Sequence, residues 1–265
     1  MLSPLGQALR RHDPDRFLTL LFAPEGRREA LVILYAFNHE LARAREVTSQ
    51  SLLALMRLQW WREVVEGVEK PGELANPLQA LLREGTLQAP ALLAMIEARE
   101  REVDGDVPTE DAWVAWLMQS AGSVAVAAGQ ALGVADPAVL EGLRLRGAAY
   151  GVAGLLRARF AYAALGHAPW PADLLAAAGL SREAAAADPL DARLLRLLER
   201  FRAQGQAWLA EARRHPAPPR PAIAAALPAV LAARDLARPL TAPPAGPRGF
   251  GDRFAATWAG LSGRV

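Results

Sequence analysis

The 265-residue chain contains no cysteine, one lysine and only four histidines. The lack of cysteine excludes disulfides, thiolate metal sites and thiol nucleophiles, and it fits a reducing compartment. His12, His39, His167 and His215 lie far apart in the sequence. They show none of the paired spacings with which one helix or loop binds a transition metal. We therefore expect no histidine-based metal site.

Long apolar runs and a strong excess of one charge are also missing. No window reaches the ~20 uninterrupted apolar residues of a membrane-spanning helix, and residues 1–17 contain no apolar core of the kind that a secretory signal needs. The formal net charge is only +2, which is not typical of proteins that bind nucleic acid through a dense basic patch. We expect a cytoplasmic protein that binds no nucleic acid.

Alanine, leucine, arginine and glutamate dominate the chain, and these residues favour helices. No segment alternates apolar and polar residues for long enough to predict a sheet. Apolar side chains recur every three or four positions in the first part of the chain, namely at Ala30, Leu34, Phe37 and Leu41. Later helices are predicted over residues 51–68, 77–84, 89–103, 109–132, 137–165, 190–213 and 222–238. The sequence therefore predicts an all-α helical bundle.

Two proline-rich stretches interrupt the helical pattern near the end of the chain. Residues 215–221 and 239–251 cannot form continuous helix, because proline removes a backbone donor and clashes with the preceding turn. We find no composition shift that marks a domain boundary. We expect a single domain over residues 1–265, with residues 239–265 as a loosely ordered C-terminal segment.

A second stripe on the first long predicted helix combines polar and small residues. Tyr35, His39, Ala42 and Glu46 are spaced so that they share one helix face. This face either lines a cavity or contains ordinary boundary residues whose hydrogen bonds are satisfied locally. The residues alone leave both interpretations open.

Four segments carry a resemblance to a known family. They extend from about residue 13 to residue 180 and include HDPDRFLTLLFAPEGRREALVILYAF, LMRLQWWREVVEG, WVAWLMQSAGSVAVAAGQALG and GAAYGVAGLLRARFAYAALGHAPWPADLLAAAGL. These segments resemble the squalene/phytoene synthase family of head-to-head prenyltransferases. The resemblance implies the isoprenoid synthase fold, a single helical bundle with a central cavity. It also implies two facing aspartate-rich motifs that hold Mg²⁺ against the substrate diphosphates.

The first motif of the family is only partly present. Its two aspartate positions fall on Ala42 and Glu46, and its arginine position falls on His39. Glu46 is thus the only acid that remains of this motif. Loss of a carboxylate removes an oxygen ligand that a hard cation such as Mg²⁺ requires.

The second motif has lost its acids altogether. Gly154 stands at the asparagine position and Arg157 keeps the arginine, whereas the carboxylate positions fall on Ala158, Ala161 and Tyr162. We expect no metal at these positions and no cofactor, unless the chain is an active transferase that uses Mg²⁺.

One branch of the family shares these departures. The AFNHELA run around Asn38 and the RLQWWR run from Arg57 to Arg62 resemble the mitochondrial complex I assembly factor and its bacterial relatives. This resemblance implies a retained fold with lost or altered catalysis. The candidate cavity or ligand-binding residues are Tyr35, Asn38, His39, Ala42, Glu46, Arg57, Trp60 and Arg157.

Arginines offer an alternative to a metal site. Arg43, Arg45, Arg57, Arg62, Arg157 and Arg159 lie in or beside the two signature helices. Arginines that point inward would hold a diphosphate or phospholipid head group through charge-assisted hydrogen bonds, whereas solvated ones would not. Of the adjacent Trp60 and Trp61, we expect one to pack in the core and the other to cover either the cavity wall or an exposed surface.

Two main functional hypotheses follow. The first is a non-catalytic isoprenoid- or lipid-binding protein or assembly factor, which contacts a membrane-protein partner at the periphery of the inner membrane. The alternative is an active prenyltransferase that acts on farnesyl or geranylgeranyl diphosphate. Its altered site would use Glu46, with Glu40 and arginines in place of the second metal cluster. A third hypothesis is a peripheral membrane protein in which an apolar helix face and arginines meet anionic lipid.

Overall fold

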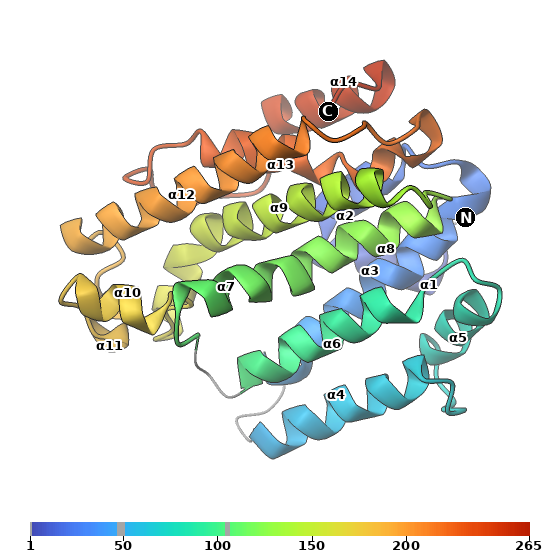
Figure 1. The fold of residues 1–265 in the computed structure, drawn as a ribbon, viewed down its shortest axis with the longest axis horizontal. Helices are drawn as coiled ribbons and strands as arrows, with labels where there is room; N and C mark the ends of the chain where they lie inside the picture. Colours follow the sequence, from blue (N-terminus) through green and yellow to red (C-terminus); the bar gives the residue numbers. More distant parts are fainter. Residues whose placement is uncertain (1, 47–50, 104–106) are drawn as a thin grey trace.

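The computed structural model describes residues 2–46, 51–103 and 107–265, without the side chains of residues 45 and 46. These residues form helices and no strand, as predicted. The elements are α1 (Pro4–His12), α2 (Pro14–Leu20), α3 (Glu25–Glu46), α4 (Ser51–Val65), α5 (Ala75–Arg83), α6 (Ala89–Val103), α7 (Glu110–Leu117), η1 (Met118–Gly122), α8 (Ser123–Ala131), α9 (Pro137–Ala164), α10 (Ala172–Ala177), α11 (Arg182–Ala187), α12 (Ala192–Ala212), η2 (Arg220–Ala225), α13 (Pro228–Leu236) and α14 (Phe250–Ser262). Figure 1 shows the long helices running along the longest axis of the molecule.

The longest described helix, α9, contacts α12 and α13 as well as α8 and η1. It begins where the Asp136 side chain accepts a hydrogen bond from the backbone N–H of Ala138, with Pro137 in the first turn. A β-carbon at Gly147 would lie 2.4 Å from the backbone oxygen of Ala121. Glycine at this position therefore permits close packing between α9 and η1.

The predicted apolar stripe of the first long helix lies in the core. Leu34, Phe37 and Leu41 of α3 are almost completely buried. The predicted helix over residues 109–132 contains a π-helical turn, η1, between α7 and α8. Within this turn the Ser120 hydroxyl donates to the Trp116 carbonyl oxygen at 2.7 Å. The single helix predicted over residues 222–238 is instead a 3₁₀ segment, η2, followed by α13.

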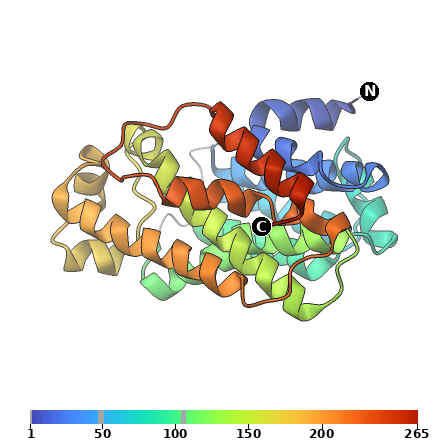
Figure 2. The ribbon, with the colours of Figure 1, turned by 90° about the horizontal axis from the view of Figure 1, so that it is seen from above.

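The end of the chain has more regular structure than the sequence suggested. Residues 239–265 were expected to be loosely ordered, yet residues 250–262 form α14, which packs on α13 and contacts α2. Figure 2 shows α14 as an outer layer over the bundle. In the described parts of the chain, no helix is long and apolar enough to cross a bilayer.

Candidate functional site

A cavity of about 1100 Å³ opens between α3, α6, α7 and α9. Small residues on α9 help to leave this space open. At Gly151 an added β-carbon would meet Leu117 and Ala121 at 2.9 Å, but at Gly154, one turn further, it would meet no atom within 4 Å. The helix thus passes from close packing to the wall of the cavity.

The structure brings the two degenerate motifs to the same cavity. Asn38, His39 and Ala42 of α3 line it, and so do Gly154 and Tyr162 of α9. Ala158 and Ala161, the other carboxylate positions of the second motif, are not among its lining residues. The Glu46 side chain lies outside the described residues.

Other predicted site residues lie away from this cavity. Tyr35 is almost fully buried beneath it, where it lines a much smaller cavity. Trp60 lines a neighbouring cavity of about 290 Å³, together with His39. Its ring meets that of Trp61 edge-on at 4.7 Å. Trp61 is buried in the core, and Trp60 packs against that core and lines the neighbouring cavity.

Two predicted arginines are corrected by the structure. Arg57 is exposed and forms an ion pair with Glu40 at 3.4 Å, so it does not line the large cavity. Arg157 pairs with Asp235 of α13 at 3.0 Å, because that carboxylate is the buried partner within its reach. Arg159 is buried and donates to the carbonyl oxygens of Leu240 and Ala242. None of the signature arginines whose side chains the structure describes lines the large cavity, so these do not form an inward ring.

The cavity contains different arginines, which the sequence did not single out. Arg16 forms an ion pair with Asp13 at 2.7 Å. Arg99 donates two hydrogen bonds to the Glu102 carboxylate, at 2.6 and 2.9 Å. Trp116 donates to the same carboxylate through its indole N–H at 2.5 Å. Each described acid that lines the cavity is therefore already engaged by a cation.

These residues do not fit the magnesium cluster that the fold family implies. Ala42 and Tyr162 offer no carboxylate, and Asp13 and Glu102 are held by arginines. Among the described residues, no three histidines, cysteines, aspartates or glutamates are close enough to hold a metal ion. A hard divalent cation needs several oxygen ligands, and the described part of the cavity wall does not supply them.

Arg16 and Tyr150, which line the cavity, pack with the buried Tyr35. The Arg16 guanidinium lies 5.5 Å from the centre of the Tyr35 ring and 5.1 Å from that of Tyr150. Burial raises the pKa of Tyr35 to about 12, although the charge of Arg16 acts in the opposite direction. Burial likewise raises the pKa of Tyr150, which donates to Asp15 at 3.3 Å.

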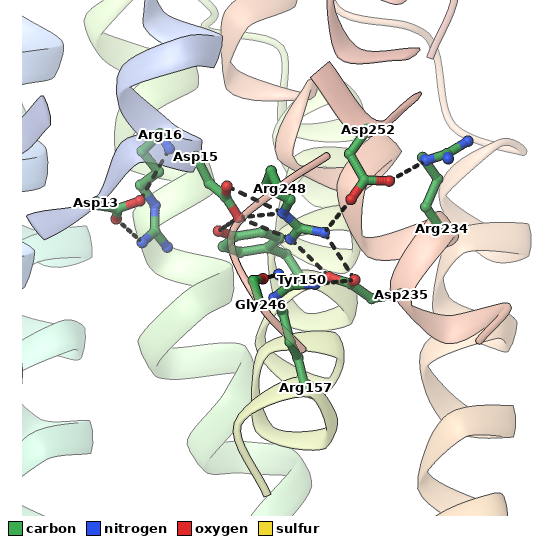
Figure 3. A network of polar contacts seen from close by, with 10 residues as sticks. All are labelled: Asp13, Asp15, Arg16, Tyr150, Arg157, Arg234, Asp235, Gly246, Arg248 and Asp252. Carbon is green, nitrogen blue, oxygen red and sulfur yellow. Dashed lines mark hydrogen bonds and ion pairs between the residues drawn. The ribbon is translucent and has the colours of Figure 1, made fainter. Parts of the chain in front are cut away.

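A network of ion pairs joins this region to the C-terminal segment (Figure 3). Arg248 lies between the carboxylates of Asp15 on α2 and Asp235 on α13, at 2.8 and 2.7 Å, and also reaches Asp252 on α14 at 3.5 Å. Burial alone would lower the pKa of Arg248, but hydrogen bonds to Asp15 and Asp235 raise it. Sequence reasoning missed Arg248 because it lies in a proline-rich stretch without helical periodicity.

The family model for squalene/phytoene synthases matches residues 9–246. The chain belongs to this family. A dehydrosqualene synthase in complex with ligand superimposes with a TM-score of 0.77 at 14% identity, covering 97% of this chain and 94% of that one. The squalene synthase HpnC from Alicyclobacillus acidocaldarius gives a TM-score of 0.69 at 20% identity, with 98% and 92% covered. These likenesses confirm the predicted isoprenoid synthase fold.

Curated relatives of another name match one part of the chain. NADH dehydrogenase (ubiquinone) complex I, assembly factor 6 of Homo sapiens is 29% identical over 102 residues. The Rattus norvegicus protein of the same name is 35% identical over 103 residues. Each match covers 37% of this chain and 31% of the relative, so the chain spans about a third of the length of these relatives. The chain is therefore similar to the assembly factors, as its sequence motifs predicted.

Proposed function

We propose that this chain is a non-catalytic member of its family, which binds an isoprenoid or another lipid in the large cavity and acts in the assembly of respiratory complex I. The observation that carries the proposal is the chemistry of the cavity wall. Ala42 and Tyr162 occupy motif positions that face the cavity, and the acids Asp13 and Glu102 are bound to arginines. Ionising a prenyl diphosphate requires strong charge neutralisation at the leaving group, which the family achieves through metal-bound carboxylates.

The size and lining of the cavity support a lipid ligand. A volume of about 1100 Å³ lies slightly above the ~300–1,000 Å³ that is typical of sites that bury small molecules. Leucine and tryptophan side chains provide apolar contact for a hydrocarbon, among them Leu117, Leu155, Trp116 and Trp170. The similarity to assembly factor 6 supports the second half of the proposal.

Catalysis is tested by incubating the purified chain with Mg²⁺ and farnesyl or geranylgeranyl diphosphate and measuring released diphosphate. An active squalene synthase serves as the positive control. We expect no release above that of the buffer. Release that is lost in Glu46→Gln, with the fold unchanged, would instead establish the transferase alternative.

Lipid binding is tested by native mass spectrometry of the chain purified from a lipid-containing extract. Gly154→Phe places a ring in the cavity, because no atom lies within 4 Å of the added β-carbon. Gly26→Phe is the matched control, since Gly26 is also an unobstructed helical glycine but lies outside the cavity. We expect bound lipid in the wild type and in Gly26→Phe, and its loss in Gly154→Phe. Equal lipid in all three proteins would contradict binding in this cavity.

The assembly role is tested by removing the gene from its host. We expect less assembled complex I in the membranes and lower NADH:quinone oxidoreductase activity, both restored by the wild-type gene. Restoration by Gly154→Phe as well would separate assembly from lipid binding. Normal complex I in the deletion strain would contradict the assembly role.

A further inference from the structure

Helix α14 presents a stripe of large apolar side chains to solvent. Phe250, Phe254, Trp258 and Leu261 are spaced by four, four and three residues, so they share one helix face. Their exposed fractions are 84%, 56%, 62% and 61%. The rings of Phe250 and Phe254 stack at 6.0 Å, and those of Phe254 and Trp258 stack at 6.4 Å. Exposure of neighbouring aromatic side chains indicates an interaction surface.

The opposite face of α14 fixes the helix in place. Ala256, Ala259 and Gly260 are buried against the bundle. A β-carbon at Gly260 would lie within 2.4 Å of the Phe22 ring, so the helix packs closely onto the end of α2. The helix ends at Gly263, whose φ of 74° suits the left-handed cap that glycine favours. The apolar stripe is therefore held outward by packing on its other side.

Arginines lie at both ends of the stripe. The only acid in α14 is Asp252, which is paired with Arg234 and Arg248. Arg253 lies in the first turns of α14 and is exposed. Arg220 reaches the other end, where it donates to the Leu261 carbonyl oxygen. The surface thus combines apolar side chains with arginines at both ends and has no unpaired carboxylate on this helix.

We propose that this stripe docks into the head-group region of an anionic lipid bilayer. Amphipathic helices of this kind lie in the plane of the interface, with aromatic residues among the acyl chains and basic residues at the phosphates. Each arginine near an anionic surface adds to the attraction. The arginines at both ends of the stripe match the phosphates of such a bilayer, and we therefore choose it as the partner rather than a second protein.

The inference does not rest on the proposed function of the cavity, since an active transferase would present the same helix. It is tested by co-sedimentation with vesicles of phosphatidylcholine alone or of phosphatidylcholine mixed with phosphatidylglycerol. We expect binding to the mixed vesicles, weakened by salt, and little binding to phosphatidylcholine alone. Lipids brominated in the acyl chains should quench the fluorescence of the wild type more than that of Trp258→Phe.

The decisive variant combines Phe250→Ser, Phe254→Ser and Trp258→Ser. Because these side chains are exposed, the fold should persist while the affinity for vesicles falls by about tenfold or more. The matched control combines Leu52→Ser, Leu53→Ser and Met56→Ser, which removes the exposed apolar residues of α4 and should leave binding unchanged.

Three results would overturn the inference. One is equal binding to mixed vesicles by the wild type and the α14 variant. Another is equal binding to both kinds of vesicle at every salt concentration, since the arginines would then contribute nothing. The last is a dimer in sedimentation velocity that dissociates in the α14 variant, because a second copy of the chain would then cover the stripe.

Discussion

Replacing Arg248 by methionine removes the central cation of the network that fastens the C-terminal segment. Only 8% of the Arg248 side chain is exposed, and Asp235 beside it is 5% exposed. Without Arg248, Asp15 keeps the Tyr150 hydroxyl at 3.3 Å and Asp235 keeps Arg157 at 3.0 Å. The carboxylates of Asp15 and Asp235 therefore remain largely buried, each without the positive charge of Arg248.

The expected loss follows from this burial. Removing one partner of a buried ion pair costs about 3–5 kcal/mol, because the remaining charge stays desolvated. This is a large part of the ~5–15 kcal/mol by which most folded proteins are stable. We expect Arg248→Met to lower the free energy of unfolding by about 3–5 kcal/mol in urea titrations followed by circular dichroism.

The matched control is Arg200→Met. Arg200 forms an ion pair with Glu110, but 58% of its side chain is exposed. Exposed pairs contribute about 0–1 kcal/mol, so this variant should unfold close to the wild type. If Arg248→Met and Arg200→Met lose similar stability, the reasoning from burial is refuted. The double variant Arg248→Met with Asp235→Asn should lose less than the sum of the two single variants.

Three further predictions concern other parts of the fold. Gly147→Ala should destabilise the protein in thermal unfolding, because the added β-carbon would lie 2.4 Å from a backbone oxygen. Gly154→Ala adds a β-carbon that meets no atom within 4 Å, so it should stabilise α9 by up to about 1 kcal/mol in the same assay. The pKa of Tyr35 rises from 10.0 in the unfolded chain to about 12 in the fold, so its contribution to stability is complete below pH 10 and is lost as the pH rises towards 12. Tyr35→Phe should therefore show a smaller loss of stability across that range in urea titrations, and an unchanged slope would contradict the buried hydroxyl. Burial alone would raise the pKa of Asp252, but hydrogen bonds and ion pairs with its arginine partners lower it below 3.8, so its stabilisation is present above that pH and is lost as the pH falls through the lowered pKa. Asp252→Asn should thus be less stable than the wild type at neutral pH and approach it in acid, and a constant difference at every pH would count against this ion pair.

The sequence predicted the parts of the fold that depend on local pattern. The buried stripe of α3 follows from the spacing of Leu34 and Phe37, because a helix with apolar residues on one side must bury that side. The family resemblance predicted that the two motifs meet at one cavity. Helical periodicity could not predict this, because it does not tell which helices lie next to each other in the fold. α14 was missed because the prolines and glycines before it obscured where a helix could begin.

The orientation of individual arginines could not be predicted in the same way. Arg157 matches a family motif position, but its direction is decided by Asp235, which lies 78 residues later in the chain. Arg16, by contrast, lies three residues after Asp13, so its ion pair was within the reach of local reasoning. A charged side chain points towards the nearest buried group of opposite charge. Tertiary packing, rather than the motif, decides which group that is.

Arg248 bears on how far along the chain the stable domain extends. The family match stops at residue 246, two residues before Arg248. A chain trimmed at that boundary would keep every residue of the cavity wall but would lose the cation that neutralises Asp15 and Asp235. The region that the family model matches thus depends on a cation that lies just beyond it. We expect the trimmed chain to bind ligand poorly even though no ligand contact has been removed.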